Sequence, residues 1–343
     1  MRITTRMMTT RYTRSLNNLS SGLDKLNYQI SSGRRFMKAS ENASAAITAF
    51  QLRRDLSKIG GYQSNIAFAQ DTLSNAESSL MHVNEMVKTI DERILQGKNG
   101  TLTGQDRAIV AEDLRAIQGQ LFQSLNATSA DSYIFGGTQT QSRPFELDVN
   151  GKLQYKGVDL DTIATNPDPT IAAKLKGDSL FLDIGLNLQF DTPSSPKLDG
   201  STAFNVAMPG INIIGSGETA LSGYTREPKA PNNLYNLLGA IAFEFEQVDY
   251  SSENVEALYG HFKTSSQDVL ITVAEIGAKT SYLDFMSNRL ESESANMLKR
   301  QVEVEYADPA KTIIDFKSQE MAYNAALQMG TRIIQPSIFD FLR

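Results

Sequence analysis

The residue types best suited to acid–base or metal chemistry are scarce in this sequence. Its 343 residues include two histidines, His82 and His261, and no cysteine. Two histidines are too few for a three-histidine zinc site, and the pattern H-E-x-x-H is absent. Without cysteine there is no thiol nucleophile, thiolate metal site or disulfide. His82 lies beside Leu80 in a helical pattern, which favours a solvated helix residue over a catalytic base. No metal or cofactor is therefore predicted.

Carboxylates and glycine-rich stretches give no stronger signal for catalysis. Glu291 and Glu293, and likewise Asp159 and Asp161, are close in sequence, but nothing distinguishes either pair from solvated surface charge. GSGETA at residues 215–220 matches the G-x-G-x-x-A dinucleotide pattern. The LSGYTREPKAP that follows cannot form the helix that would hold a pyrophosphate, so we interpret the match as a turn. The sequence predicts a protein that is not an enzyme.

Charge is distributed unevenly along the chain. The net charge of -6 and the pI near 5.2 give no support to nucleic acid as a partner. Residues 1–40 nevertheless carry a cluster of lysines and arginines against Asp24 alone, so a basic head precedes an acidic remainder. The Arg-rich start resembles a mitochondrial transit peptide in composition, but it runs directly into a heptad pattern. No apolar run approaches the ~18 residues that span a bilayer, so no membrane partner is predicted.

Apolar residues recur at alternating steps of three and four at both ends of the chain, which is the spacing of a coiled-coil seam. The longest seam, over residues 59–94, has no gap and predicts a helical stretch about 54 Å long at 1.5 Å per residue. Its members are Ile59, Tyr62, Ile66, Ala69, Leu73, Ala76, Leu80, Val83, Val87, Ile90 and Ile94. Further seams cover residues 110–125 and 269–304. The pattern predicts long helices packed in an antiparallel bundle.

Residues 138–231 differ in kind from the helical ends. DVNGKLQYKG places Asn150 and Gly151 between alternating apolar residues, the strongest short signal for a hairpin. LFLDIGLNLQF at residues 180–190 alternates at period two over much of its length, which predicts a strand. The predicted fold class is therefore mainly α with a β-rich insert, in which the N- and C-terminal regions form an elongated antiparallel helical bundle. The expected parts are a terminal helical stalk (1–40 and 308–343), the bundle (41–137 and 232–307) and an inserted outer domain (138–231).

The two terminal helices carry seams that need a partner, since an exposed apolar stripe costs about 25 cal/mol per Å² relative to burial. The head and tail helices are natural partners, yet two helices alone bury too little surface to be stable. We therefore expect frayed ends that order when neighbouring copies add their own helices. The predicted assembly interface comprises Leu16, Leu19, Leu23, Leu26, Ile30, Ile313, Phe316, Tyr323, Leu327, Ile334, Phe339, Phe341 and Leu342. This pattern is typical of a polymer subunit.

Three segments also resemble a known family. MRITTRMMTTRY, followed by LNYQISSGRRFMKASENASAAITAFQLRRDL, is similar to the start of the flagellar hook-filament junction proteins, which are hook-associated proteins similar to flagellin. YIFGGTQTQSRPFEL at residues 133–147 is similar to that family's passage from the helical bundle into the outer domain. IIQPSIFDFLR at the end resembles the family's C-terminus.

The resemblance implies a structural component of the bacterial flagellum, an adaptor between the hook-side junction protein and the filament. It implies self-association in a ring, contacts with the hook-side junction protein and with flagellin, and an export chaperone that binds the C-terminal helix. It also implies export through the flagellar type III channel to an extracellular location.

The sequence departs from the family pattern in two places, and other classes stay open. Residues 38–43 lack both prolines of the usual Pro-Ser-Asp-Asp-Pro turn. Asp91 stands where flagellins recognised by an innate immune receptor have an arginine, which argues against recognition of that type. Filament flagellin is the nearest alternative. A coiled-coil surface adhesin, or an enzyme with a site in the β insert, is the alternative from a different class.

Overall fold

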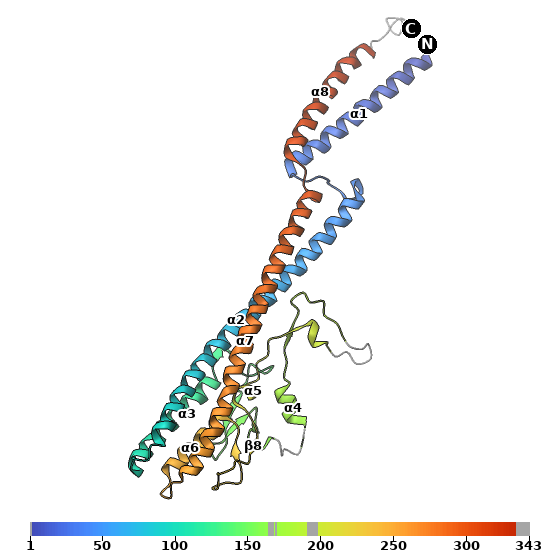
Figure 1. The fold of residues 1–343 in the computed structure, drawn as a ribbon. Helices are drawn as coiled ribbons and strands as arrows, with labels where there is room; N and C mark the ends of the chain where they lie inside the picture. The colour runs from blue at the N-terminus through green and yellow to red at the C-terminus, as the bar shows by residue number, and fades with distance from the viewer. Residues whose placement is uncertain (1, 164–167, 169, 191–197, 334–343) are drawn as a thin grey trace. The chain divides into compact units, whose positions relative to one another are not determined.

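The computed structural model describes residues 2–163, 168, 170–190 and 198–333 (Figure 1). Its long helices are α1 (Arg2–Ser32), α2 (Ala43–Gly97), α3 (Gly104–Leu125), α7 (Ser252–Glu305) and α8 (Pro309–Ile333). The shorter helices are α4 (Thr170–Lys176), α5 (Ile211–Ile214) and α6 (Leu234–Glu246), with 3-10 turns at Ala39–Glu41 and Gly200–Thr202. Strands of two or three residues lie between α3 and α6. The predicted class, mainly α with a β-containing insert, is confirmed.

The chain folds into two compact units. Unit 1 comprises residues 1–60 and 290–343, and unit 2 comprises residues 61–289. The helices α2 and α7 contribute to both units, and the boundary in α2 falls between Gly60 and Gly61. The predicted division into stalk, bundle and outer domain is a different division, and it stays a prediction.

Unit 2 is built on the long seam of α2. From Ile66 to Ile94 every predicted seam residue is buried, and Leu80 has no exposed surface. The predicted seam of α3 is buried too, and its members are Val110, Leu114, Ile117, Leu121 and Leu125. On α7, Val269, Ile276 and Leu283 are buried in the same unit. Strict alternation of three and four residues places these side chains on one face of each helix, which explains why the sequence predicted them.

The ends of the shorter helices are set by local sequence. Thr103 caps α3 and forms a capping box with Asp106, in which the Asp106 backbone N–H donates to Thr103 Oγ1 at 3.2 Å. In return, Thr103 donates to Asp106 Oδ2 from its Oγ1 at 2.7 Å and from its backbone N–H at 3.0 Å, and these two bonds lower the pKa of Asp106. Asn233 caps α6 by accepting a 2.8 Å bond from the backbone N–H of Asn236. The two capped helices α3 and α6 pack along each other.

The insert contains the predicted hairpin. Strands β3 (Phe145–Leu147) and β4 (Leu153–Tyr155) pair antiparallel, and Asp148 Oδ1 accepts 2.8 Å bonds from the backbone of Asn150 and Lys152. Gly151 has φ = +77°, a conformation that glycine adopts without strain. β5 (Val158–Asp159) extends this sheet. The remaining strands pair as β1 (Thr128–Ser129) with β2 (Ser132–Tyr133), β6 (Phe181–Leu182) with β7 (Phe204–Asn205), and β8 (Glu218–Thr219) with β9 (Ala230–Pro231).

The strand predicted over residues 180–190 is mostly wrong. Phe181–Leu182 forms a paired strand and Phe190 forms one isolated bridge with Leu198, but between them the chain turns at Asp183, whose Oδ1 accepts from the Gly185 backbone N–H at 3.0 Å. The turn is held against helices of unit 2, because Asn65 Nδ2 donates to the Asp183 carbonyl at 2.7 Å and Arg289 donates to the Gly185 carbonyl at 3.2 Å. Alternating hydrophobicity therefore did not outweigh an Asp-Ile-Gly turn.

The interpretation of Asp161 as solvated charge is also wrong. Asp161 is 2% exposed, and its carboxylate accepts from Asn233 Nδ2 at 2.5 Å and from Asn236 Nδ2 at 2.9 Å. Lys152 Nζ lies 3.4 Å away. Burial raises the pKa of Asp161, while the bonds from Asn236 and Lys152 oppose that shift. The carboxylate thus fastens the insert to the start of α6.

Candidate assembly surface on the terminal helices

The terminal helices α1 and α8 pair with each other and bury little of their surface. They run side by side within unit 1 (Figure 1). The predicted α1 residues Leu16, Leu19, Leu23 and Leu26 are half-buried, and Ile30 is 42% exposed. From residue 6 to residue 32 no side chain of α1 is buried. The pair therefore leaves its apolar seam partly open to solvent.

The predicted residues of α8 differ in their exposure. Phe316 and Tyr323 are half-buried, whereas Ile313 is 49% exposed and Leu327 is 43% exposed. Buried positions on α8 are instead Thr312, Ala326 and Gly330. The predicted residues Ile334, Phe339, Phe341 and Leu342 lie outside the described residues.

Small residues let the two helices approach each other closely. Tyr12 Oη donates to the Ala326 carbonyl at 3.1 Å and lies where a Cβ on Gly330 would be. Gln319 covers Gly22, and a Cβ built there would lie 2.5 Å from Gln319 Nε2. A search of the sequence for large apolar residues passes over glycine and alanine, so it did not find these contacts.

Large apolar side chains consequently face solvent on both helices. This set, which we call the open face, consists of Met7, Met8, Ile30, Ile313, Ile314, Met321, Leu327 and Met329. Each is at least 42% exposed. A partner that covered these side chains would be favoured, because burying exposed apolar surface is favourable.

Next to the open face, the two chain segments that leave the terminal pair are joined. Arg34 and Tyr306 form an antiparallel bridge, in which the Arg35 backbone N–H donates to the Glu305 carbonyl at 2.7 Å and the Ala307 N–H donates to the Gly33 carbonyl at 2.9 Å. We call residues 33–35 and 305–307 the crossover. Sequence reasoning missed it, because no periodic pattern marks a two-residue bridge between segments so far apart in the chain.

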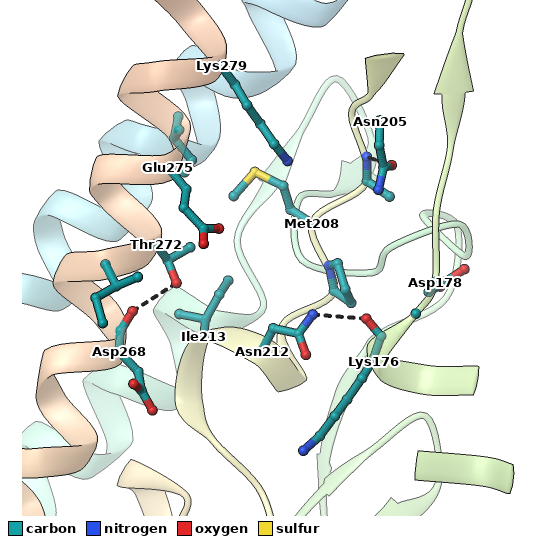
Figure 2. Close-up of a pocket in the computed structure, with 15 residues that line it drawn as sticks. Lys176, Asp178, Asn205, Met208, Asn212, Ile213, Asp268, Thr272, Glu275 and Lys279 are labelled. Carbon is teal, nitrogen blue, oxygen red and sulfur yellow. Dashed lines mark hydrogen bonds between the residues drawn. The ribbon is translucent and has the colours of Figure 1, made fainter. Parts of the chain in front are cut away.

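Unit 2 has a cavity of about 490 Å³ beside α7. Figure 2 shows Glu275 and Lys279 of α7 on one wall and Lys176 and Asn212 on the other. Asn212 Nδ2 donates to the Lys176 carbonyl at 3.0 Å. None of the residues lining this cavity carries a buried polar side-chain atom without a partner. The cavity therefore gives no specific indication of a ligand.

The two histidines lie on different helices, His82 on α2 and His261 on α7. His82 is exposed on α2, as predicted. His261 is half-buried, its Nε2 lies 3.0 Å from Asn232 Oδ1, and burial lowers its pKa. At residues 215–220 the chain bends at Gly215 and Gly217, which have positive φ, and then enters strand β8 instead of a helix. Within the described residues no group of histidines and carboxylates has the arrangement of a metal site.

Comparisons with known proteins agree with this geometry. Residues 3–140 match the family model of the bacterial flagellin N-terminal helical region. Over the full length of both chains, the protein is 26% identical to flagellar hook-associated protein 3 of Salmonella typhimurium. Flagellin A of Rhizobium meliloti is also 26% identical, but over 55% of this chain and 48% of its own. The fold resembles that of the flagellar junction protein FlgL from Legionella pneumophila, with TM-score 0.53 and 13% identity over 77% of this chain and 100% of that chain.

The matched region and the full-length similarity to a hook-associated protein support the predicted class, a flagellin-like structural component of the bacterial flagellum. Within that class, the predicted resemblance to the hook-associated proteins of the hook-filament junction (FlgL) is confirmed. The junction prediction is supported over filament flagellin, because the hook-associated relative matches along its whole length and the flagellin along about half.

Proposed function

We propose that the protein is an adaptor of the flagellar hook-filament junction, which associates with copies of itself in a ring through α1 and α8. The observation that carries this proposal is the open face. Helices α1 and α8 pair through small residues and leave eight large apolar side chains in water. Neighbouring copies that bring the same helices would cover them, which gives a gain proportional to the apolar area removed from water.

The proposed partners at the two ends of the ring are the hook-side junction protein and flagellin. Both are proposed because the chain is similar to a hook-associated protein over its full length and matches the flagellin model over residues 3–140. A partner with flagellin-like terminal helices could continue the same helix packing above or below the ring.

We further propose that the chain is exported through the flagellar type III channel to the cell exterior, with an export chaperone on the C-terminal helix. A chain without cysteine crosses such a channel without disulfides to reduce. A chaperone bound to α8 would cover Ile313, Ile314 and Met321 before assembly, when they are most prone to aggregate. Among the described helices none is long and apolar enough to span a bilayer.

The experiment that tests the junction role is localisation in purified flagella. Gold-labelled antibodies against the chain should mark a short zone where the hook meets the filament. A strain that lacks the chain should keep hooks and release flagellin monomers into the medium. Labelling along the whole filament would favour filament flagellin, and labelling of the cell surface outside the flagellum would favour an adhesin.

A further inference from the structure

Glu305 of the crossover is buried and forms an ion pair with a half-exposed arginine, and no part of the proposed function requires this pair. Glu305 is the last residue of α7 and is 4% exposed. Arg53 of α2 grips its carboxylate with two parallel bonds, from Nε at 2.7 Å and from Nη2 at 2.5 Å. Gln301 Nε2, one turn earlier on α7, donates to the same carboxylate at 3.3 Å. Bidentate arginine–carboxylate pairs of this kind are strong and fix geometry.

The same residue also holds the crossover through its main chain. The Glu305 carbonyl accepts the 2.7 Å bond from the Arg35 backbone N–H, and the Arg35 carbonyl in turn accepts from Gln29 Nε2 at 2.7 Å. The side chain of Glu305 therefore reaches α2 while its carbonyl reaches the segment that follows α1. Glu305 thus connects α7 both to α2 and to the segment that follows α1.

The surroundings explain why such a residue would matter. On one side of the crossover, the α1 side chains from residue 6 to residue 32 are at most half-buried, so α1 and α8 are held weakly. On the other side, Ala46, Ala49 and Ile59 of α2 are buried. Local opening spreads through weakly packed segments until a well-bonded element stops it.

We propose that Glu305 is a positioning residue that stops the opening of the α1–α8 pair at the crossover. With the Arg53–Glu305 pair intact, the terminal helices separate and rejoin without loosening the segments of α2 and α7 in unit 1. Without it, opening continues into those segments. This role of Glu305 rests on the proposed function in one respect. When the ring assembles, the terminal helices of each subunit would be held at the crossover.

The test is amide hydrogen exchange on the purified full chain, with Glu305→Gln compared with Glu303→Gln. Glu303 is an exposed neighbour on the same helix, so its variant is the matched control. In Glu305→Gln the amides of Arg35 and Ala307 should exchange about tenfold faster than in wild type, which corresponds to about 1.4 kcal/mol. The control should exchange like wild type. Equal rates in the two variants would overturn the proposal.

A double-mutant cycle separates positioning from a general loss of stability. Arg53→Gln removes the other partner of the ion pair. The Arg53 side chain is 45% exposed, so the glutamine that replaces it remains in contact with water. The Arg35 amide of the double variant should exchange no faster than in either single variant, because all three variants lack the same Arg53–Glu305 ion pair. The melting temperature of unit 2 should be the same in all four proteins. Additive effects, or a fall in that melting temperature, would show a general structural role instead.

Failure of this inference and failure of the junction role are distinguishable. The exchange experiment uses the purified chain and does not depend on where the chain is located. If wild-type protein is absent from the hook-filament junction, the proposed function fails while the crossover result stands. If it is present there and Glu305→Gln exchanges like Glu303→Gln, the positioning role fails alone.

Discussion

Replacing Leu80 by alanine is the sharpest test of the packing of unit 2. Leu80 is at the middle of the α2 seam and has no exposed surface. Truncating a fully buried leucine removes its transfer free energy and leaves a cavity, which together cost about 2.7–5 kcal/mol in well-packed cores. In a unit of this size, each kcal/mol lowers the melting temperature by about 2–4 °C. We therefore expect Leu80→Ala to melt about 5–20 °C below wild type.

The control is the next residue on the same helix. Met81 is 57% exposed, so Met81→Ala removes a side chain that contributes little to the core. Surface substitutions of this kind change stability by about 0.5 kcal/mol or less. Thermal melts followed by circular dichroism at the helix band compare the three proteins directly. If Leu80→Ala melted together with Met81→Ala, the seam would not be the core of unit 2.

Three further predictions follow from the contacts. Asp161→Ala should lower the free energy of unfolding of unit 2 by about 1–3 kcal/mol in urea, because the buried side-chain amide of Asn236 loses its acceptor. An unchanged free energy of unfolding would show that water replaces the lost carboxylate. Hydrogen bonds from Arg53 lower the pKa of Glu305 in the folded chain. The pair therefore stabilises unit 1 fully above the pKa of an unfolded glutamate, about 4.3, and this stabilisation is lost as the pH falls through the lower pKa of the folded state. Hydrogen exchange at the crossover should accelerate over that acid range in wild type but not in Glu305→Gln. Deleting residues 310–343 should leave the melting of unit 2 unchanged and abolish assembly; assembly of the shortened chain would exclude α8 from the interface.

The sequence predicted the parts of the fold that depend on local periodicity. The seams of α2 and α3 follow the 3–4 spacing without a break, and this spacing places the apolar side chains on one face of each helix, where packing can bury them together. The Asn150-Gly151 hairpin was equally visible, because its turn needs a residue with positive φ and glycine supplies it.

The sequence did not predict features that depend on a distant partner. Asp161 is buried because Asn233 and Asn236, more than 70 positions away, donate to it. On α8, the contact face could not be recognised from hydrophobicity, since Gly330 packs because it is small and Tyr12 fills the space. The Arg53–Glu305 pair likewise joins two ordinary surface-type residues separated by most of the chain.

Hydrogen exchange before and after incorporation tests the central claim, that the open face of the terminal helices is covered in the assembled flagellum. Amides of α1 should exchange rapidly in the free chain, because its side chains from residue 6 to residue 32 are at most half-buried and fixing each residue costs about 1–2 kcal/mol of chain entropy. In flagella that contain the chain, the same amides and those of α8 should become protected. Slow exchange in the free chain, or unchanged exchange after incorporation, would contradict the claim that α1 and α8 are the assembly surface.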